Sequence, residues 1–219
     1  MSQNIPQEIT LNFIQDIQKK ERRVAEFLGE KIIINKNVFP VDSPFSYSSK
    51  IIAKRISQNV GIVLDVGTGT GVQGIIAARR GAKKVISIDI DKNCLENARE
   101  NVKFHKLDNI IEVRKSDLFE NINLNEKFDL IISQLPFADV NYKCIVGHFI
   151  FDPNFELHKK LLKEARYHLN TNGKILIPSG EVANEPRLNE LIQEFGYKII
   201  KIEEESYQDL IWKLYIIGL

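Results

Sequence analysis

The stretch LDVGTGTGVQGIIAA, residues 64–78, joins a short apolar segment to a helix-forming segment through a run of glycines. Gly67, Gly69 and Gly71 have no side chains where the backbone must turn tightly and approach a ligand. Asp89 ends the next apolar segment about 20 residues further on, where a carboxylate can accept hydrogen bonds from ribose hydroxyls. The stretch therefore predicts a strand, a loop and a helix that together bind a ligand containing a ribose.

The spacing of the glycines distinguishes two kinds of ribose ligand. A dinucleotide fingerprint reads G-x-G-x-x-G, but counted from the first glycine its third would fall at Val72; Gly69, Gly71 and Gly74 fit only in a shifted frame. A leading G-x-G-x-G after an acidic residue is typical of enzymes that use S-adenosylmethionine. There the loop faces an amino-acid tail and a ribose, and Asp65 would help to hold the cationic ammonium group. The alternative is that the glycines serve only the tight turn.

Apolar strands alternate with helical segments along most of the chain. Strands are expected at residues 62–66, 85–89, 110–113, 128–133 and 174–178, with helices at 72–80, 92–104, 154–169 and 186–195. Strands that are apolar throughout are buried on both faces, which indicates a parallel sheet covered by helices. Residues 197–204 and 210–217 predict two further strands joined by a polar segment. We therefore expect an α/β fold, doubly wound and mostly parallel, that ends in an antiparallel C-terminal hairpin.

The beginning of the chain predicts a small appendage. Apolar residues at helical spacing predict a helix over residues 6–28, with Gly29 as its stop. Two short strands, 32–34 and 38–39, would then form a hairpin around the turn between them.

A second helix is expected to open at Ser43, which would cap it, with Pro44 in its first position, and to run through Ile56. We divide the chain into residues 1–42, a lid or a contact to substrate or to a second copy, and residues 43–219, the main domain.

Composition excludes several classes of protein. A hydrophobic fraction of 43% rules out a disordered chain, and a net charge of +1 gives no strong electrostatic attraction to nucleic acid. Cys94 and Cys144 form no CxxC pair, and the four histidines lack metal-ligand spacing, so no metal site is expected. No apolar run is long enough for a membrane span, and the polar N-terminus does not read as a secretion signal. We expect a cytoplasmic protein without a membrane partner.

Three motifs give the chain a family resemblance. VLDVGTGTG (63–71), ISIDID (86–91) and KSDLFE (115–120) resemble the first three motifs of class I methyltransferases that use S-adenosylmethionine. Residues 81–101 are especially similar to ribosomal-protein and protein-glutamine methyltransferases. Residues 38–56 look like the segment that those enzymes and related RNA methyltransferases place before the glycine loop. The resemblance implies a Rossmann-like sheet of seven strands.

The resemblance also implies which residues hold S-adenosylmethionine. Asp89 would bind the ribose, with Ile90 beside the adenine; Asp117 would accept a hydrogen bond from the adenine amino group, with Leu118 packed nearby. The residues expected to hold the cofactor are Asp65, Gly67, Thr68, Gly69, Gly71, Asp89, Ile90, Asp117, Leu118 and Gln134.

The end of the fourth strand supplies the candidate catalytic corner, Gln134-Leu135-Pro136-Phe137. Related amino-group methyltransferases have Asn-Pro-Pro-Tyr or Asn-Pro-Pro-Phe there, whose Asn side chain accepts a hydrogen bond from the target amino group while the aromatic ring stacks on it. Here Gln134 is one methylene longer, and Leu135 replaces a proline. Three interpretations remain open: a retuned site, a site whose substrate contacts come mainly from other residues, and a non-catalytic binding subunit.

Further candidates follow this corner. Asp139 comes directly after it, and His158, or less strongly His148, could accept the proton that methylation releases. Asp152 and His158 could equally be a helix-start residue and a helix-face residue. The candidate catalytic residues are Gln134, Pro136, Phe137, Asp139 and His158.

The sequence is compatible with three functions. The first is methylation of a nitrogen, or as a second choice an oxygen, of a small molecule or a protein side chain. The second, not favoured by the balanced charge, is methylation of a flipped nucleic-acid base. The third is a non-catalytic partner that binds S-adenosylmethionine; a homodimer is an open alternative to a monomer.

Overall fold

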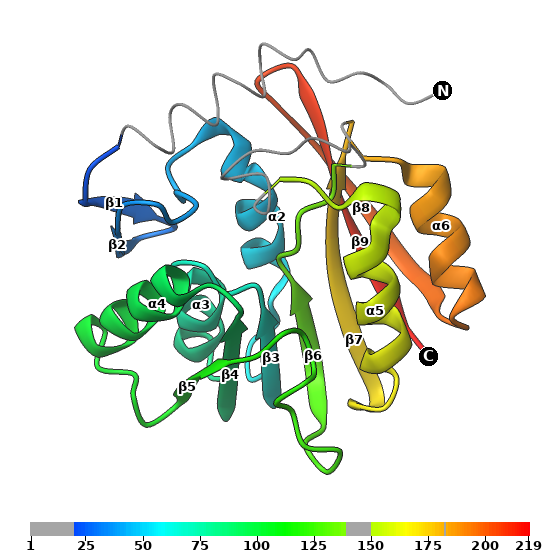
Figure 1. Ribbon diagram of the computed structural model, residues 1–219, viewed down its shortest axis with the longest axis horizontal. Coiled ribbons are helices and arrows are strands. Elements are labelled where there is room, and N and C mark those ends of the chain that lie inside the picture. Colours follow the sequence, from blue (N-terminus) through cyan, green and yellow to red (C-terminus); the bar gives the residue numbers. More distant parts are fainter. Residues whose placement is uncertain (1–19, 139–149, 182) are drawn as a thin grey trace.

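The computed structural model describes residues 20–138, 150–181 and 183–219, which form one seven-stranded sheet, a separate two-stranded hairpin and helices on both faces (Figure 1). The strand order in the sheet is β5-β4-β3-β6-β7-β9-β8. Its strands are β3 (Ile62–Val66), β4 (Lys84–Asp89), β5 (Ile111–Lys115), β6 (Phe128–Ser133), β7 (Leu169–Gly180), β8 (Lys198–Tyr207) and β9 (Leu210–Gly218).

The sheet is parallel except for one strand. β3, β4, β5, β6 and β7 pair in parallel, whereas β9 is antiparallel to both of its neighbours, β7 and β8. The chain reverses between β8 and β9 at Gln208 and Asp209, both at positive φ. The predicted doubly wound sheet with an antiparallel C-terminal hairpin is therefore confirmed.

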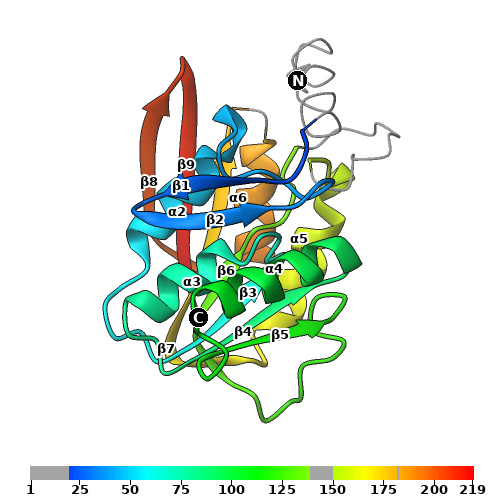
Figure 2. The same cartoon turned by 90° about the vertical axis from the view of Figure 1, so that its left-hand side faces the viewer.

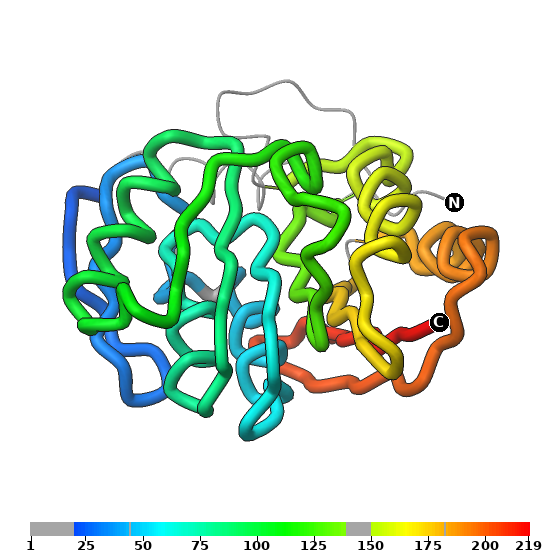
Figure 3. Tube along the Cα trace, turned by 90° about the horizontal axis from the view of Figure 1, so that it is seen from below, coloured from blue at the N-terminus to red at the C-terminus, as the bar shows by residue number. Residues whose placement is uncertain are grey.

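Helices cover the two faces of the sheet (Figures 2 and 3), and each face has its own cluster of buried apolar side chains. On one face lie α2 (Tyr47–Arg55), α3 (Val72–Arg79) and α4 (Lys92–Phe104); on the other lie α5 (Glu156–Ala165) and α6 (Glu185–Glu194). Neighbouring strand residues point to opposite faces, so Val63 belongs to the first cluster and Leu64 to the second. This two-sided burial explains why the parallel strands are apolar at nearly every position.

The prediction of a helix up to residue 28 is wrong for the part that the structure describes. Residues Arg23–Phe27 form strand β1, which pairs along its whole length with β2 (Glu30–Ile34). Leu28 and Gly29 make the two-residue turn, both at positive φ, as tight hairpin turns require. A glycine at positive φ ends a helix or closes a hairpin equally well, so local sequence did not separate the two. Residues 6–19 of the predicted helix lie outside the described residues.

The second predicted strand of that hairpin, 38–39, is also wrong, because Val38 and Phe39 lie in a turn and an irregular segment. The hairpin instead packs on α4, where two buried asparagines bind the backbone of β2. The Ile33 N–H donates to Asn101 Oδ1 at 2.8 Å, and the Ile33 carbonyl accepts from Asn97 Nδ2 at 2.9 Å and Asn101 Nδ2 at 2.7 Å. These amides satisfy backbone groups that no neighbouring strand reaches.

The second helix starts as predicted but in two pieces. Ser43 Oγ accepts from the Phe45 N–H at 3.3 Å and begins a short 3₁₀ turn, η1 (Pro44–Ser46), which continues as α2. Among the described residues, no helix has both the length and the apolar character needed to cross a lipid bilayer.

Candidate active site

The glycine loop lies between β3 and α3, at the carboxyl ends of the parallel strands. Gly67, Gly69 and Gly71 all have positive φ, at 71°, 55° and 83°. A Cβ at Gly67 would lie 3.0 Å from the Gln134 carbonyl oxygen, and one at Gly71 would lie 3.2 Å from Ala98 Cα. Packing therefore explains the first and third glycines, whereas a Cβ at Gly69 would meet nothing within 4 Å. The open space over Gly69 leaves room for a ligand.

Asp65 is joined to this loop by hydrogen bonds. Its Oδ2 accepts from Thr68 Oγ1 at 2.6 Å and Ser87 Oγ at 3.3 Å, and the Gly67 and Thr68 N–H groups both donate to the Ile88 carbonyl at 2.9 Å. The side chain is fully buried, and this burial raises the pKa of Asp65 to about 6. Asp65 Oδ1 is buried and has no hydrogen-bond partner among the residues that the structure describes. A buried carboxylate oxygen in that state is stabilised by a cationic group brought next to it.

Asp89, at the end of β4, is tied to the same loop. Its Oδ2 accepts from the Gly69 N–H at 3.0 Å and its Oδ1 from the Asp91 N–H at 2.9 Å, while burial raises its pKa. The next side chain, Ile90, is 60% exposed. An acidic group and an exposed apolar one thus lie side by side at the strand end, which suits a ligand with a hydroxylated ring and a flat apolar ring.

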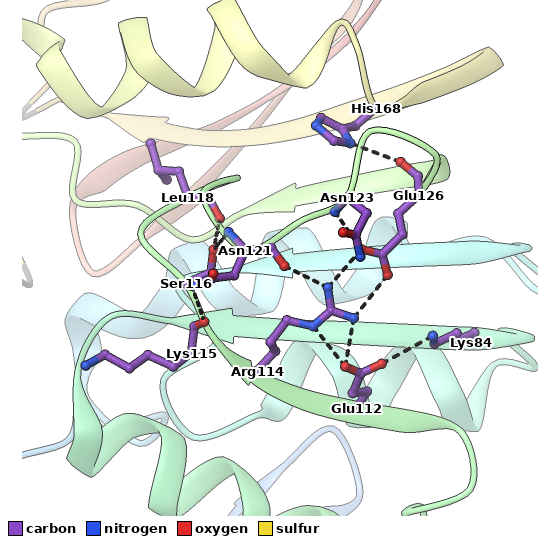
Figure 4. A network of polar contacts seen from close by, with 10 residues as sticks. All are labelled: Lys84, Glu112, Arg114, Lys115, Ser116, Leu118, Asn121, Asn123, Glu126 and His168. Carbon is purple, nitrogen blue, oxygen red and sulfur yellow. Dashed lines mark hydrogen bonds and ion pairs between the residues drawn. The ribbon is translucent and has the colours of Figure 1, made fainter.

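The loop that contains Asp117 and Leu118 is held by a network of charged and polar groups (Figure 4). Arg114 donates to the Asn121 carbonyl at 2.9 Å and pairs with Glu126 at 2.8 Å, and its guanidinium lowers the pKa of Glu126 to about 2. Leu118, at positive φ, is buried in the apolar cluster of the α5 face.

At the tip of this loop, Asp117 is 40% exposed and lies 3.1 Å from Lys160 Nζ. Its carboxylate is therefore accessible to a ligand, but solvent screens its interaction with the lysine.

The corner after β6 is joined to the glycine loop and to two helices. The Gln134 N–H donates to the Val66 carbonyl at 2.9 Å, and its side-chain Oε1 accepts from Ser49 Oγ on α2 and Gln73 Nε2 on α3, each at 3.1 Å. Gln73 is fully buried and also donates to the Ser49 carbonyl at 2.9 Å. Sequence reasoning missed Ser49 and Gln73. The only signal was a glutamine among the apolar residues of the helix after the glycine loop.

Phe137 ends this corner against the C-terminal hairpin. Its ring lies edge-on to Trp212 of β9, with 6.4 Å between centroids and 86° between planes. Gly180 lies beside both rings, since a Cβ there would be 4.0 Å from Phe137 and 3.7 Å from Trp212. Phe137 is half-buried, so part of the ring remains accessible. Pro136 lies between Gln134 and Phe137 and is half-buried too.

His158, on α5, is fully buried and paired. Its Nδ1 lies 2.7 Å from Asp152 Oδ2, and the same carboxylate accepts from the N–H groups of Leu157 at 2.9 Å and His158 at 3.1 Å. His158 Nε2 is buried, and none of the described residues forms a hydrogen bond with it. The Asp152 N–H donates to the Ala138 carbonyl at 3.0 Å, which fixes this pair beside the residue that directly follows the corner.

Some predicted residues cannot be placed. Asp139, His148 and Cys144 lie outside the described residues, so the expectation of a role for Asp139 stays a prediction. Cys94 is buried on α4 as a free cysteine. Within the described residues there is no group of three His, Cys, Asp or Glu side chains suited to a metal ion.

A seven-stranded sheet with one reversed strand, a glycine loop at its carboxyl edge and an acid at the end of the next strand define the class I methyltransferase fold. The chain belongs to the methyltransferase small domain family, whose sequence profile matches residues 30–208. The predicted family and fold are thereby confirmed.

Among relatives, a ribosomal protein L11 methyltransferase of Lactobacillus johnsonii is 31% identical over 150 residues, covering 68% of this chain and 41% of that one. A putative protein N5-glutamine methyltransferase of Methanocaldococcus jannaschii is 26% identical over 182 residues, covering 80% and 89%. The solved tRNA m1G37 methyltransferase of M. jannaschii superposes with a TM-score of 0.64 at 18% identity, covering 92% of this chain and 57% of that one. The chain thus spans about two fifths of the length of the L11 relative that it matches.

Proposed function

We propose that this protein transfers a methyl group from S-adenosylmethionine to a nitrogen, or as a second choice an oxygen, of a small molecule or a protein side chain. One observation carries the proposal: Asp65, which is hydrogen-bonded to Thr68 of the glycine loop, has a buried carboxylate oxygen with no partner in the described part of the chain, and the loop has open space at its middle glycine. A cationic ammonium group with a ribose attached nearby, as in S-adenosylmethionine, would satisfy that oxygen and extend toward Asp89.

The residues at the strand ends fit the other parts of this cofactor. Asp89 would accept hydrogen bonds from the ribose hydroxyls, and Ile90 would lose its exposure against the adenine. Asp117 would accept from the adenine amino group, with Leu118 beneath. When bound, the cofactor supplies a methyl group that its positive sulfur has already activated, so no strong acid is required of the protein.

The protein's own contribution would be positioning and exclusion of water. The corner from Gln134 to Phe137 would orient the acceptor in line with the methyl group. In such a transfer the substrate's lone pair would form the new bond to carbon, the electron pair of the broken bond would stay on sulfur, and the substrate's proton would leave to solvent or to a nearby base. His158 is a candidate for that base, although its burial requires the substrate or a water to reach Nε2.

The relatives support a nitrogen acceptor on a protein. Their names describe methylation of ribosomal protein L11 and of the N5 nitrogen of glutamine. This chain covers less than half of the L11 relative, so the relatives' names support a protein side chain as one of the two proposed substrate classes and do not transfer that protein's activity to this chain.

Calorimetry with S-adenosylhomocysteine tests the proposal. We expect binding to the wild type and 10- to 150-fold weaker binding to Asp89→Asn, the equivalent of about 1.5–3 kcal/mol for a hydrogen bond to a charged group. Asp91→Asn is the matched control. The Asp91→Asn substitution also removes one negative charge, two residues from Asp89. Asp91 caps α4, and Asn caps a helix about as well as Asp does, so the start of the helix is preserved. Preferential binding of NAD, or equal affinity of both variants, would refute the assignment.

A further inference from the structure

The side-chain amide of Gln134 is held in one orientation by two other side chains. Its Oε1 lies 3.1 Å from Ser49 Oγ and 3.1 Å from Gln73 Nε2. Ser49 belongs to α2 and Gln73 to α3, so the two donors approach from two separate helices that pack on the same face of the sheet.

The identity of the Gln134 atom that faces them follows from a backbone group. The Ser49 carbonyl can only accept a hydrogen bond, so the Gln73 atom 2.9 Å away from it must be the amide nitrogen. That same nitrogen lies 3.1 Å from the Gln134 amide, so the Gln134 atom facing it must be an acceptor, which is Oε1. If oxygen and nitrogen were exchanged in the Gln73 amide, its oxygen would face the Ser49 carbonyl oxygen. If they were exchanged in the Gln134 amide, two NH₂ groups would face each other.

This arrangement uses the acceptor capacity of the Gln134 side chain. A carbonyl oxygen has two lone pairs, and here Ser49 and Gln73 fill both. Both hydrogen bonds of the Gln134 side chain to residues that the structure describes are made by Oε1, which leaves Nε2 at the other end of the amide, and Gln134 is only half-buried. What the Gln134 side chain has left to offer a ligand is therefore a pair of N–H donors, the opposite of the side-chain role that the Asn-Pro-Pro-Tyr pattern implies.

We infer that the Gln134 side chain donates a hydrogen bond to the substrate that receives the methyl group. The substrate is then a planar group in which a hydrogen-bond-accepting atom lies next to the nitrogen or oxygen that is methylated. This inference rests on the proposed function. A donor aimed at the attacking lone pair itself would hold that pair back from the methyl group, so the accepting atom must be a neighbour. A carboxamide, with its carbonyl beside its nitrogen, and an amino group beside a ring nitrogen share this chemistry. The accessible part of Phe137 suits a flat partner.

The first test measures the amide orientation without any ligand. Gln134→Glu keeps two acceptor oxygens for Ser49 and Gln73, whereas Gln134→Met keeps the length and loses both hydrogen bonds. We expect the thermal midpoint of Gln134→Glu at pH 7 to stay close to that of the wild type, and that of Gln134→Met to fall by about 2–6 °C.

Two donors lower the pKa of the introduced carboxyl, so its advantage over Met is present at neutral pH and declines as the pH falls through that pKa. A midpoint for Gln134→Glu below that of Gln134→Met at pH 7 would mean that Gln134 faces its neighbours with nitrogen, and would overturn the inference.

The second test measures what the free end of the amide recognises. With S-adenosylhomocysteine present, ligand-detected NMR compares 2-aminopyrimidine, which has ring acceptors beside its amino group, with aniline, which has the same shape and none. We expect saturation transfer to 2-aminopyrimidine that exceeds transfer to aniline several-fold, and loss of this preference in Gln134→Glu, which has no donor to offer. Equal signals in the wild type, no signal from either compound, or an unchanged preference in the variant would overturn the inference. Failure of S-adenosylhomocysteine itself to bind would instead count against the proposed function.

Discussion

The Nδ1 atom of His158 lies 2.7 Å from Oδ2 of Asp152, and neither residue is more than 1% exposed to solvent. The carboxylate also accepts two backbone N–H groups at the start of α5, so it receives three donors in all. Asp152 follows Phe151, which bridges to Ala138 beyond the corner. The pair therefore joins the beginning of α5 to the end of the candidate catalytic corner.

From this relationship we predict a large effect on stability. His158→Ala removes one donor from a buried carboxylate and leaves a cavity, so we expect a loss of about 3–5 kcal/mol and a thermal midpoint lower by about 6–15 °C. Lys159→Ala, the next residue on α5, is the control and should change the midpoint by about 1 °C or less, because its ion pair is at the surface. A midpoint for His158→Ala equal to that of the control would show that the pair does not stabilise the fold.

Asp65 should lower the stability of the ligand-free protein and increase the affinity for the ligand. Raising its pKa from 3.8 to about 6 corresponds to about 3 kcal/mol of destabilisation once the group is ionised. Because the folded-state pKa is the higher one, the folded state loses this stability as the pH rises from about 4 to about 6, and the cost is fully present above pH 6. Asp65→Asn should therefore raise the thermal midpoint of the ligand-free protein at pH 8 and do so much less at pH 4.

The same substitution should weaken S-adenosylhomocysteine binding by 10-fold or more at pH 8, since a charge-assisted hydrogen bond is lost. The matched control is Asp108→Asn, an exposed residue at the amino end of β5, for which neither quantity should change. If Asp65→Asn lowered the midpoint at pH 8 and left affinity intact, Asp65 would be a structural residue only.

The exposure of Ile90 gives a prediction that separates binding from folding. Ile90→Ser removes an apolar side chain that is 60% exposed, so the thermal midpoint should change little. If the adenine covers this side chain, the loss of apolar contact should weaken S-adenosylhomocysteine binding by about 5- to 50-fold, equivalent to roughly 1–2.3 kcal/mol. Ile200→Ser on β8, which is 55% exposed and remote in the strand order from β4, should leave the affinity unchanged. Equal affinity of the two variants would place the adenine elsewhere.

Two glycines of one loop should respond differently to alanine. Gly67→Ala places a Cβ 3.0 Å from the Gln134 carbonyl oxygen at positive φ, so we expect a loss of about 2–4 kcal/mol in stability. Gly69→Ala meets nothing within 4 Å, so its stability cost should be only the backbone strain of about 1–2 kcal/mol. Its methyl group would occupy the space proposed for the ligand, and calorimetry should detect weakened S-adenosylhomocysteine binding. Undiminished affinity in folded Gly69→Ala would contradict a ligand over this glycine.

The sequence by itself determined the main architecture. Apolar strands and helices alternate over residues 62–195 at the positions expected, with ends that differ by a few residues, because a strand buried on both faces and a helix buried on one have different local patterns. The glycine loop and Asp89 were also readable, since consecutive parallel strands bring their carboxyl ends to one edge. These features depend on residues close together in the chain.

Only the tertiary structure decided the features that depend on distant partners. Residues 23–28 belong to a hairpin in place of the end of a predicted helix, and Asn97 and Asn101, more than 60 residues away, bind the backbone of its second strand. The orientation of the Gln134 amide depends on Ser49 and Gln73, which lie 85 and 61 residues away in sequence. A hydrogen bond between distant residues leaves no periodic trace in the sequence, because any side chain with the right polar atom can supply it once the fold brings the two together.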